Sequence, residues 1–249
     1  MEGCGLTVKV VFATPTIKRP FAPYLKALED SVPVLDSAGI EHQAVFKVGC
    51  PYISGARAEL TRAALDAKAD MIIYLDHDVS WDPQDLVTLI RAEGDVVAGT
   101  YRLKQEHEEY MGAHFCDATG RPVVRASDRA VKARLVPAGF LKITKEGINR
   151  FMHAYPELCF GPLFSQSVDL FNHGAVLGDR IWWGEDFCFA QRWNDKCGDL
   201  WLLPNLNIAH HAADGTAYPG NYHNFLRRNP GGDLSANPMP PVPILKAIA

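Results

Sequence analysis

The alternation of strand-like and helix-like segments over the first hundred residues is the feature that most constrains this fold. Short apolar runs rich in β-branched residues alternate there with longer segments whose apolar residues recur at helical spacing. Strands are expected at 8–13, 41–48, 71–75 and 95–101, and helices at 23–38, 54–68 and 82–93. Strands joined by helices form βαβ units, which predicts a mostly parallel sheet with helices on both faces.

The second half of the chain is less regular. From Ala212 onward Gly, Pro and Asn are frequent, which indicates irregular structure. We therefore expect an α/β fold, a three-layer α/β/α sandwich over residues 1–222, with an irregular C-terminal tail over 223–249 packed on it. The elements expected before that tail are a strand at 134–143, a helix from the cap residue Thr144 to about Tyr155, a helix at 185–196, and short apolar runs at 200–203 and 206–211.

Composition excludes several classes of protein. The chain has 249 residues, of which 47% are hydrophobic, and this suits one large domain. A net charge of −4 gives no overall basic field to attract nucleic acid. No apolar run approaches the roughly 18 residues that span a bilayer, and no signal peptide is recognisable. None of the six cysteines has C-x-x-C spacing, so free thiols in a cytoplasmic protein without a membrane span are expected.

The most informative motif is Asp76-His77-Asp78, which follows the buried strand at 71–75. In an extended segment alternate side chains face the same way, so both carboxylates are expected to enter one crevice beyond the end of the strand. Two such acids suit a hard divalent ion, Mn²⁺ or Mg²⁺, that also binds phosphate oxygens. The alternative is that an acid here caps the next helix, but Asp82 before Pro83 is expected to fill that role.

Two further motifs carry groups suited to chemistry. Glu185 and Asp186 open a helix after a Trp-Trp-Gly turn, where a carboxylate can take a proton from an attacking hydroxyl. The plainer alternative is that both acids only complement the helix dipole. His210 and His211 end a short apolar run, and either imidazole can complete a metal site or lie in the core or on the surface.

Basic residues provide two weaker signals. Arg57, in the first turn of the helix at 54–68, is placed to bind phosphate, although a solvated arginine is the more frequent finding at such positions. The stretch 121–134 carries five basic residues against Asp128, a local charge of +4 (five minus one). It predicts either a solvated basic loop or contact with an acidic polymer. These residues are Arg121, Arg125, Arg129, Lys132 and Arg134.

The order of these motifs resembles the nucleotide-sugar glycosyltransferases of the GT-A fold, near the family-2-like and mannan-polymerase-like branches. The resemblance covers residues 8 to about 222. It rests on Thr-Pro-Thr after the first strand and Ser-Gly-Ala-Arg at a helix start, followed by IIYLDHDV, VVAGTYRLK, VPAGFLKITKEG, WWGEDFCFAQRW and LWLLPNLNIAHH. It implies a metal-dependent enzyme that moves a sugar from a nucleotide-sugar donor to an acceptor hydroxyl, within a GT-A-type sandwich.

The resemblance also assigns roles to individual residues. It implies that Asp76 and Asp78 hold the metal and the donor diphosphate, with His210 as the third metal ligand and His211 as its rival. His77 departs from the pattern, because many relatives have a small or apolar residue there. The remaining assignments are Thr14, Pro15 and Arg57 beside the nucleotide, Ala138-Gly139-Phe140 under the donor sugar, and Glu185-Asp186 facing the acceptor, with Asp186 or Glu185 as catalytic base.

The acceptor and two other functions stay open at this stage. The acceptor is expected to be a saccharide, or DNA with hydroxymethylated bases, as modified in the host cytoplasm by small glycosyltransferases of bacterial viruses. A haloacid-dehalogenase-like phosphatase also uses an acid pair like Asp76 and Asp78, with Asp179 and Asp186 as distal acids, but its pair normally ends the first strand. A non-catalytic nucleotide-sugar-binding module is expected to lack one of the acids, and here all are present.

Overall fold

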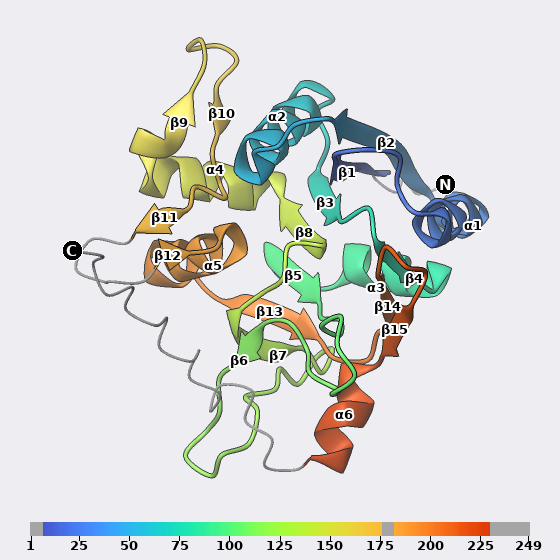
Figure 1. Cartoon of the computed structure of the whole chain (residues 1–249). Helices are drawn as coiled ribbons and strands as arrows, with labels where there is room; N and C mark the ends of the chain where they lie inside the picture. Colours follow the sequence, from blue (N-terminus) through green and yellow to red (C-terminus); the bar gives the residue numbers. More distant parts are fainter. Residues whose placement is uncertain (1–6, 176–181, 230–249) are drawn as a thin grey trace, which may run out of the picture.

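An eight-stranded mixed sheet forms the centre of the protein (Figure 1). The computed structural model describes residues 7–175 and 182–229. Strands β7 and β8 run opposite to the other six strands of this sheet, so the expected mostly parallel α/β sheet is confirmed. In spatial order the strands are β2 (Ile40–Val48), β1 (Val8–Thr16), β3 (Met71–Leu75), β8 (Phe140–Thr144), β5 (Val96–Gly99), β13 (Leu200–Leu203), β7 (Val131–Leu135) and β6 (Ala113–His114).

Helices cover both faces of the sheet. One apolar core contains buried residues of α2 (Ile53–Asp66), α4 (Lys145–Ala154) and α5 (Glu185–Lys196). The other contains buried residues of α1 (Ala22–Ser37) and α3 (Pro83–Arg91). The central strands supply alternate residues to the two cores, Val11 and Ala13 to the first and Val10 and Phe12 to the second. Three layers follow from this division.

Small sheets and short elements complete the described chain. A three-stranded sheet joins β15 (Ala217–Gly220), β14 (Ile208–His211) and β4 (Val79–Trp81), and it brings His210 opposite Val79. No helix of the described residues is long and apolar enough to cross a bilayer. The other elements are η1 (Pro156–Leu158), the pair β9 (Cys159–Phe160) and β10 (Ser167–Val168), the pair β11 (Gly174–Ala175) and β12 (Trp182–Trp183), and α6 (Tyr222–Arg228).

Several expected boundaries are confirmed. Strand β3 coincides with the expected segment, and β1, β2, α1 and α5 match within a few residues. Thr144 caps α4, because its hydroxyl accepts a 3.0 Å hydrogen bond from the backbone N–H of Gly147. Cys50, Cys159, Cys188 and Cys197 are free thiols, as expected.

The structure corrects three expectations about elements. The single strand expected at 134–143 is two strands, β7 and β8, because Pro137 between them cannot donate to a ladder. Helix α2 begins at Ile53, one residue before the expected start. Asp82 occupies the cap position of α3 but makes no capping bond, since its Oδ2 accepts from the side chain of Asn207 at 3.0 Å instead.

The expectation of irregular structure from Ala212 onward is also wrong for the described residues. The chain forms β15, which pairs with β14, and then α6. Helix α6 has a local start signal, because the Asn221 side chain accepts from the backbone N–H of Asn224 at 3.1 Å. Residues 230–249 of the expected tail lie outside the described residues.

Candidate functional site

The acid pair at the end of β3 is presented by a turn and not by extended chain. The backbone N–H of Val79 donates to the carbonyl of Asp76 at 3.1 Å, which closes the turn. The N–H of Asp76 donates to the carbonyl of Gly139 at 3.0 Å and fixes the entry to it. Asp76 and Asp78 consequently have different partners. His77, between them, packs edge-on against Phe21, with ring centres 5.4 Å apart.

Arg57 joins the acid of β3 to the acids of α5. Its guanidinium donates to Asp76 Oδ1 at 3.0 Å and to Glu185 Oε1 at 2.9 Å. It lies 4.9 Å from the centre of the Phe171 ring and is only 2% exposed. Burial alone would lower the pKa of Arg57, but Asp76 and Glu185 raise it, so the cation is permanent. In this structure the guanidinium therefore forms ion pairs with two carboxylates of the protein.

Asp78 is the centre of a second cluster. The Lys104 ammonium contacts its Oδ2, and Nε2 of His210 lies 3.5 Å from the same oxygen. Burial would raise the pKa of Asp78, but hydrogen bonds from His210 and Lys104 outweigh it and hold that pKa well below its usual range. Nδ1 of His210 lies 2.9 Å from the carbonyl oxygen of Arg102, which can only accept, so Nδ1 carries a hydrogen and Nε2 faces Asp78.

The adjacent acids at the start of α5 differ in their acidity. Burial, followed by repulsion from Glu185, raises the pKa of Asp186 to about 6. Burial would also raise the pKa of Glu185, but Arg57 lowers it below its usual value. Neighbouring acids whose pKa values are pushed apart can fill different chemical roles, with Glu185 favoured as a carboxylate and Asp186 able to exchange a proton near neutral pH.

Tyr101 lies close to both the Arg57 cluster and the Asp78 cluster, and Gly139 leaves room for its hydroxyl. A Cβ on Gly139 would collide with the hydroxyl of Tyr101 and lie 2.6 Å from Asp76 Oδ2, so only glycine fits there. The Tyr101 ring meets the His210 ring edge-on at 5.0 Å. Burial, with the charges of Asp76 and Asp186, raises the pKa of Tyr101 well above its usual value, so its hydroxyl stays protonated.

Other residues named from the sequence lie nearby with their own partners. Thr14 and Pro15 are buried at the end of β1, and the Thr14 hydroxyl is bonded to that of Tyr24. His211 Nε2 is 2.7 Å from Ser80 Oγ, whereas Nε2 of His210 is 3.5 Å from Asp78 Oδ2. His210, not His211, is therefore the imidazole beside Asp78. Asp179 lies outside the described residues.

The donor set suits a divalent cation only in part. Among the described residues no three His, Cys, Asp or Glu side chains gather as a group able to hold a metal. Asp78 Oδ2 and His210 Nε2 nevertheless face each other at 3.5 Å beside a cationic ammonium. One carboxylate and one imidazole suit Mn²⁺ when substrate phosphates complete the shell. Asp76 faces Arg57 and does not join them.

The basic stretch at 121–134 uses part of its charge internally. The Arg125 guanidinium pairs with Asp128 at 2.6 Å and lies 4.3 Å from the Trp201 ring centre. Lys132 pairs with Asp199 at 2.7 Å. Two of its five basic side chains are therefore paired with acids of the protein.

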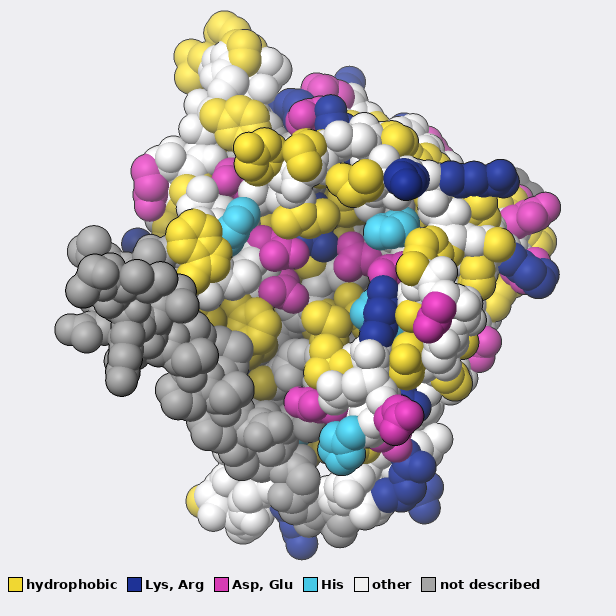
Figure 2. All heavy atoms as spheres, viewed as in Figure 1, with side chains coloured by type: hydrophobic (Ala, Val, Ile, Leu, Met, Phe, Trp, Pro, Cys, Tyr) yellow, Lys and Arg dark blue, Asp and Glu magenta, His cyan; other side chains and the backbone are white. Residues whose placement is uncertain are grey.

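Sequence reasoning missed Lys104. It lies in the segment YRLK, which the resemblance includes without assigning it a role, and its contact with Asp78 joins residues 26 positions apart. No local pattern marks such a contact. Figure 2 shows acidic side chains gathered near the middle of the visible face, with histidine and basic side chains beside them.

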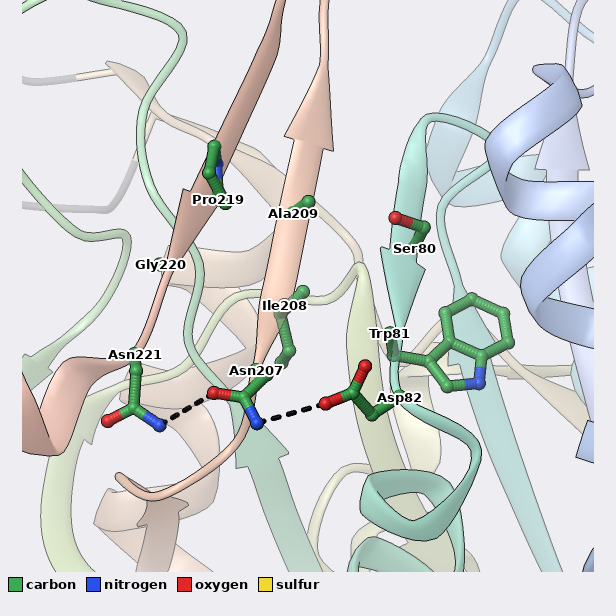
Figure 3. A pocket seen from close by; sticks show the side chains of 9 residues that line it. All are labelled: Ser80, Trp81, Asp82, Asn207, Ile208, Ala209, Pro219, Gly220 and Asn221. Atoms are coloured by element: carbon green, nitrogen blue, oxygen red, sulfur yellow. Dashed lines mark hydrogen bonds between the residues drawn. The ribbon is translucent and has the colours of Figure 1, made fainter.

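A groove of about 430 Å³ adjoins this site along β4, β14 and β15 (Figure 3). At one end, the Asn207 side chain donates to Asp82 and accepts from Asn221, both at 3.0 Å. Ser80 and Ala209, in its wall, are neighbours in sequence of Val79 and His210. The groove is lined by Ser80, Trp81, Asp82, Asn207, Ile208, Ala209, Pro219, Gly220 and Asn221.

No protein-family model and no curated protein matches the sequence. Similar solved structures include the A197 protein from STIV, with 17% identity, a TM-score of 0.49, and coverage of 86% of this chain and 95% of that one. A Drosophila β1,4-galactosyltransferase 7 variant, solved with manganese, UDP-Gal and xylobiose, has 14% identity, a TM-score of 0.42 and coverage of 89% and 74%. A glycosyltransferase involved in glycosylation of the major capsid of PBCV-1 has 8% identity, a TM-score of 0.33 and coverage of 60% and 65%. Because these identities and TM-scores are low, we infer the function only from the chemistry of the site.

Proposed function

We propose that this protein is a glycosyltransferase that moves a sugar from a nucleotide-sugar donor to a hydroxyl of an acceptor saccharide. One observation carries the proposal. Arg57 bridges Asp76 and Glu185, so the acid pair after β3 and the acid pair that opens α5 belong to one site. In the first pair, Asp78 adjoins His210, and together they suit a metal ion that also binds phosphate. In the second pair, Asp186 can exchange a proton near neutral pH.

Asp186 is the proposed catalytic base. With a pKa of about 6 it is mostly ionised at neutral pH, yet basic enough to take a proton from an acceptor hydroxyl. Glu185, held by Arg57, keeps a negative charge next to it and maintains that raised pKa. Tyr101 supplies a protonated hydroxyl beside Asp76, where it can give a hydrogen bond to an oxygen atom of the nucleotide-sugar.

Asp78 and His210 are the residues that would hold Mn²⁺ or Mg²⁺ together with the donor. A bound divalent ion neutralises charge that builds on a departing diphosphate. The Arg102 carbonyl orients His210 through Nδ1, as the outer-shell partners of metal-binding histidines do. Asp76, Thr14, Pro15, Arg57 and Gly139 remain the proposed border of the donor site, with Arg57 acting through the carboxylates it positions.

A saccharide acceptor is preferred over modified DNA, since Arg125 and Lys132 of the basic stretch are paired internally. A phosphatase is not favoured. Its attacking carboxylate needs an open oxygen, whereas Asp76 Oδ1 is bound by Arg57 and Oδ2 lies close to Gly139. The acid pair also follows the third strand along the chain and not the first.

A donor-hydrolysis screen across nucleotide sugars with Mn²⁺ tests the proposal, because slow hydrolysis requires no known acceptor. We expect hydrolysis of at least one donor and a metal-dependent thermal shift with its nucleoside diphosphate. Asp78→Ala should lose that shift while staying folded, whereas Asp214→Ala, on an exposed turn, should retain it. Stabilisation by fluoroberyllate without any nucleotide effect would favour the phosphatase. A response to no nucleotide sugar would reject glycosyl transfer.

A further inference from the structure

Lys104 is carried by a closed loop at residues 102–110. The ends of the loop pair as a β-bridge between Arg102 and Tyr110, and the N–H of Leu103 donates to the carbonyl of Glu109 at 2.9 Å. The Arg102 guanidinium turns back to donate to the carbonyls of Gln105 and Glu106, at 3.3 and 3.1 Å. The loop is thus shaped by its own backbone and by the Arg102 side chain.

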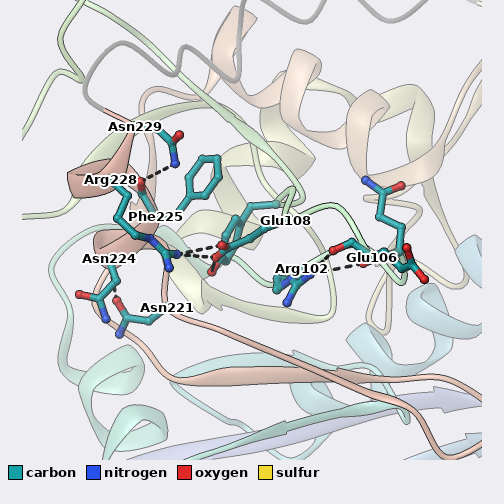
Figure 4. Close-up of polar contacts among 10 residues, drawn as sticks. Arg102, Glu106, Glu108, Asn221, Asn224, Phe225, Arg228 and Asn229 are labelled. Atoms are coloured by element: carbon teal, nitrogen blue, oxygen red, sulfur yellow. Dashed lines mark hydrogen bonds and ion pairs between the residues drawn. The ribbon is translucent and has the colours of Figure 1, made fainter.

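Contacts with α6 and β14 hold this loop in place (Figure 4). Arg228 of α6 donates to both carboxylate oxygens of Glu108, at 2.9 and 2.8 Å. The Tyr110 ring packs on Tyr222 and Phe225, with centres 5.1 and 5.2 Å away. On the other side the Arg102 carbonyl accepts from His210 of β14. Lys104 therefore projects from a fixed backbone, and only its side chain needs to move.

The Lys104 ammonium contacts the carboxylate that is proposed to bind metal. Its side chain is 33% exposed, and that of Asp78 is 15% exposed. An ammonium on a flexible four-carbon stem is a mobile point charge. A divalent ion bound by the same oxygen would repel it, because like charges a few Å apart in a partly buried site interact strongly.

We propose that Lys104 is the exchangeable counter-ion of Asp78. It neutralises Asp78 while the donor is absent, and it turns to the diphosphate oxygens of the donor when a divalent cation binds Asp78. This inference rests on the proposed function and adds a residue that recognises the diphosphate. The phosphate oxygens give the displaced ammonium a charged partner within reach of its stem, and they separate the two cations.

Two binding measurements test the exchange without any activity assay. The probes are Mn²⁺ alone, followed by electron paramagnetic resonance, and inorganic pyrophosphate at saturating Mn²⁺, followed by calorimetry. Lys104→Met should bind Mn²⁺ about tenfold more tightly, since its competitor is gone, and pyrophosphate at least about tenfold more weakly. Lys26→Met is the matched control, because Lys26 also pairs with an aspartate, Asp30, but on the surface of α1.

The outcomes separate this inference from the function on which it rests. If the parent binds both probes and Lys104→Met does so with the affinities of Lys26→Met, Lys104 is not a counter-ion, and the proposed function stands. Weaker binding of pyrophosphate without tighter binding of Mn²⁺ also overturns the exchange. If the parent binds neither probe, both the inference and the metal-dependent function fail. Circular dichroism of each variant confirms that it is folded.

Discussion

At the scale of single residues, ionisation of Asp186 is expected to support activity and to lower the stability of the fold. Its pKa is about 6 in the folded protein and about 4 in an unfolded chain, so folding takes up a proton between these values. The stability it contributes is complete below pH 4 and is lost as pH rises through 6. Asp186→Asn should therefore raise the free energy of unfolding at pH 8 by about 1 to 3 kcal/mol.

The same variant should keep donor binding and lose transfer by at least about 10²-fold, as expected for a lost base. In the parent, kcat/KM should fall tenfold per pH unit below about pH 6. Urea unfolding and initial rates measure the two effects. Near-normal transfer by Asp186→Asn together with inactive Glu185→Gln would exchange their roles, and activity in both would remove the pair from the chemistry.

Lys142 is a second buried ionisable residue, located on the central strand β8. Its ammonium donates to the carbonyl of Ala92 at the end of α3, and burial lowers its pKa to about 8. The folded protein thus binds fewer protons than the unfolded chain between pH 8 and about 10.5. Stability from this residue rises with pH across that window, is complete above it, and is lost as pH falls through 8.

Replacing Lys142 by methionine should abolish this rise. Between pH 8 and 10 the free energy of unfolding of the parent should gain about 2 kcal/mol relative to Lys142→Met. Lys145→Met, at an exposed position in the next helix, should track the parent. The measurement is urea unfolding at each pH, and identical pH profiles for the parent and Lys142→Met would contradict the assignment.

At the scale of elements, α6 is expected to hold the loop at 102–110. Tyr222 is 1% exposed, packs on Tyr110 and is 2.8 Å from Nδ1 of His114 through its hydroxyl. Tyr222→Ala should cost about 3 to 5 kcal/mol of stability and speed amide hydrogen exchange in 102–110 at least about tenfold. His223→Ala, one residue further and exposed, should change neither. Unaltered exchange in the loop of a destabilised Tyr222→Ala would show that α6 does not hold it.

Elements formed by local pattern were the predictable part of the fold. Apart from β4, the helices and strands from 8 to 101 follow from apolar spacing and turn residues, and β3 matches residue for residue. The division between β7 and β8 was missed because their apolar runs adjoin, although Pro137 marked it. Helix α6 was missed because it packs against Tyr110 of a distant loop, while the segment around it is rich in Gly, Pro and Asn.

The candidate site was predictable in its composition but not in its pairing. Both acid pairs, Arg57 and His210 were identified from the sequence, because strand ends and helix starts are local features. The sequence did not reveal the ion pairs of the site, because their partners are far apart along the chain. The Arg57–Glu185 contact spans 128 residues, and the Lys104–Asp78 contact spans 26. Asp82 failed as a cap for the same reason, because Asn207, from the far end of the chain, takes its carboxylate.

At the scale of the whole molecule, Arg57 ties the N-terminal half of the sheet to α5. It bonds to one carboxylate of each part and is almost completely buried, so removing it leaves Asp76 and Glu185 as uncompensated charges in a poorly solvated place. Arg57→Met should lower the free energy of unfolding by about 3 to 5 kcal/mol. It should also raise the pKa of Glu185, which Arg57 now lowers.

Neutralising the two carboxylates that Arg57 binds should restore the free energy of unfolding that Arg57→Met loses. In the triple variant Arg57→Met, Asp76→Asn, Glu185→Gln, no buried charge lacks a partner, and replacement of a buried ion triad by neutral groups of similar volume is often close to neutral for stability. We expect urea unfolding to return to within about 1 kcal/mol of the parent, while donor binding stays lost because Asp76 is gone. Lys26→Met, whose pair with Asp30 lies on the surface of α1, should cost less than about 1 kcal/mol. A loss below about 1 kcal/mol for Arg57→Met, or no recovery in the triple variant, would show that the bridge does not join the two parts through charge.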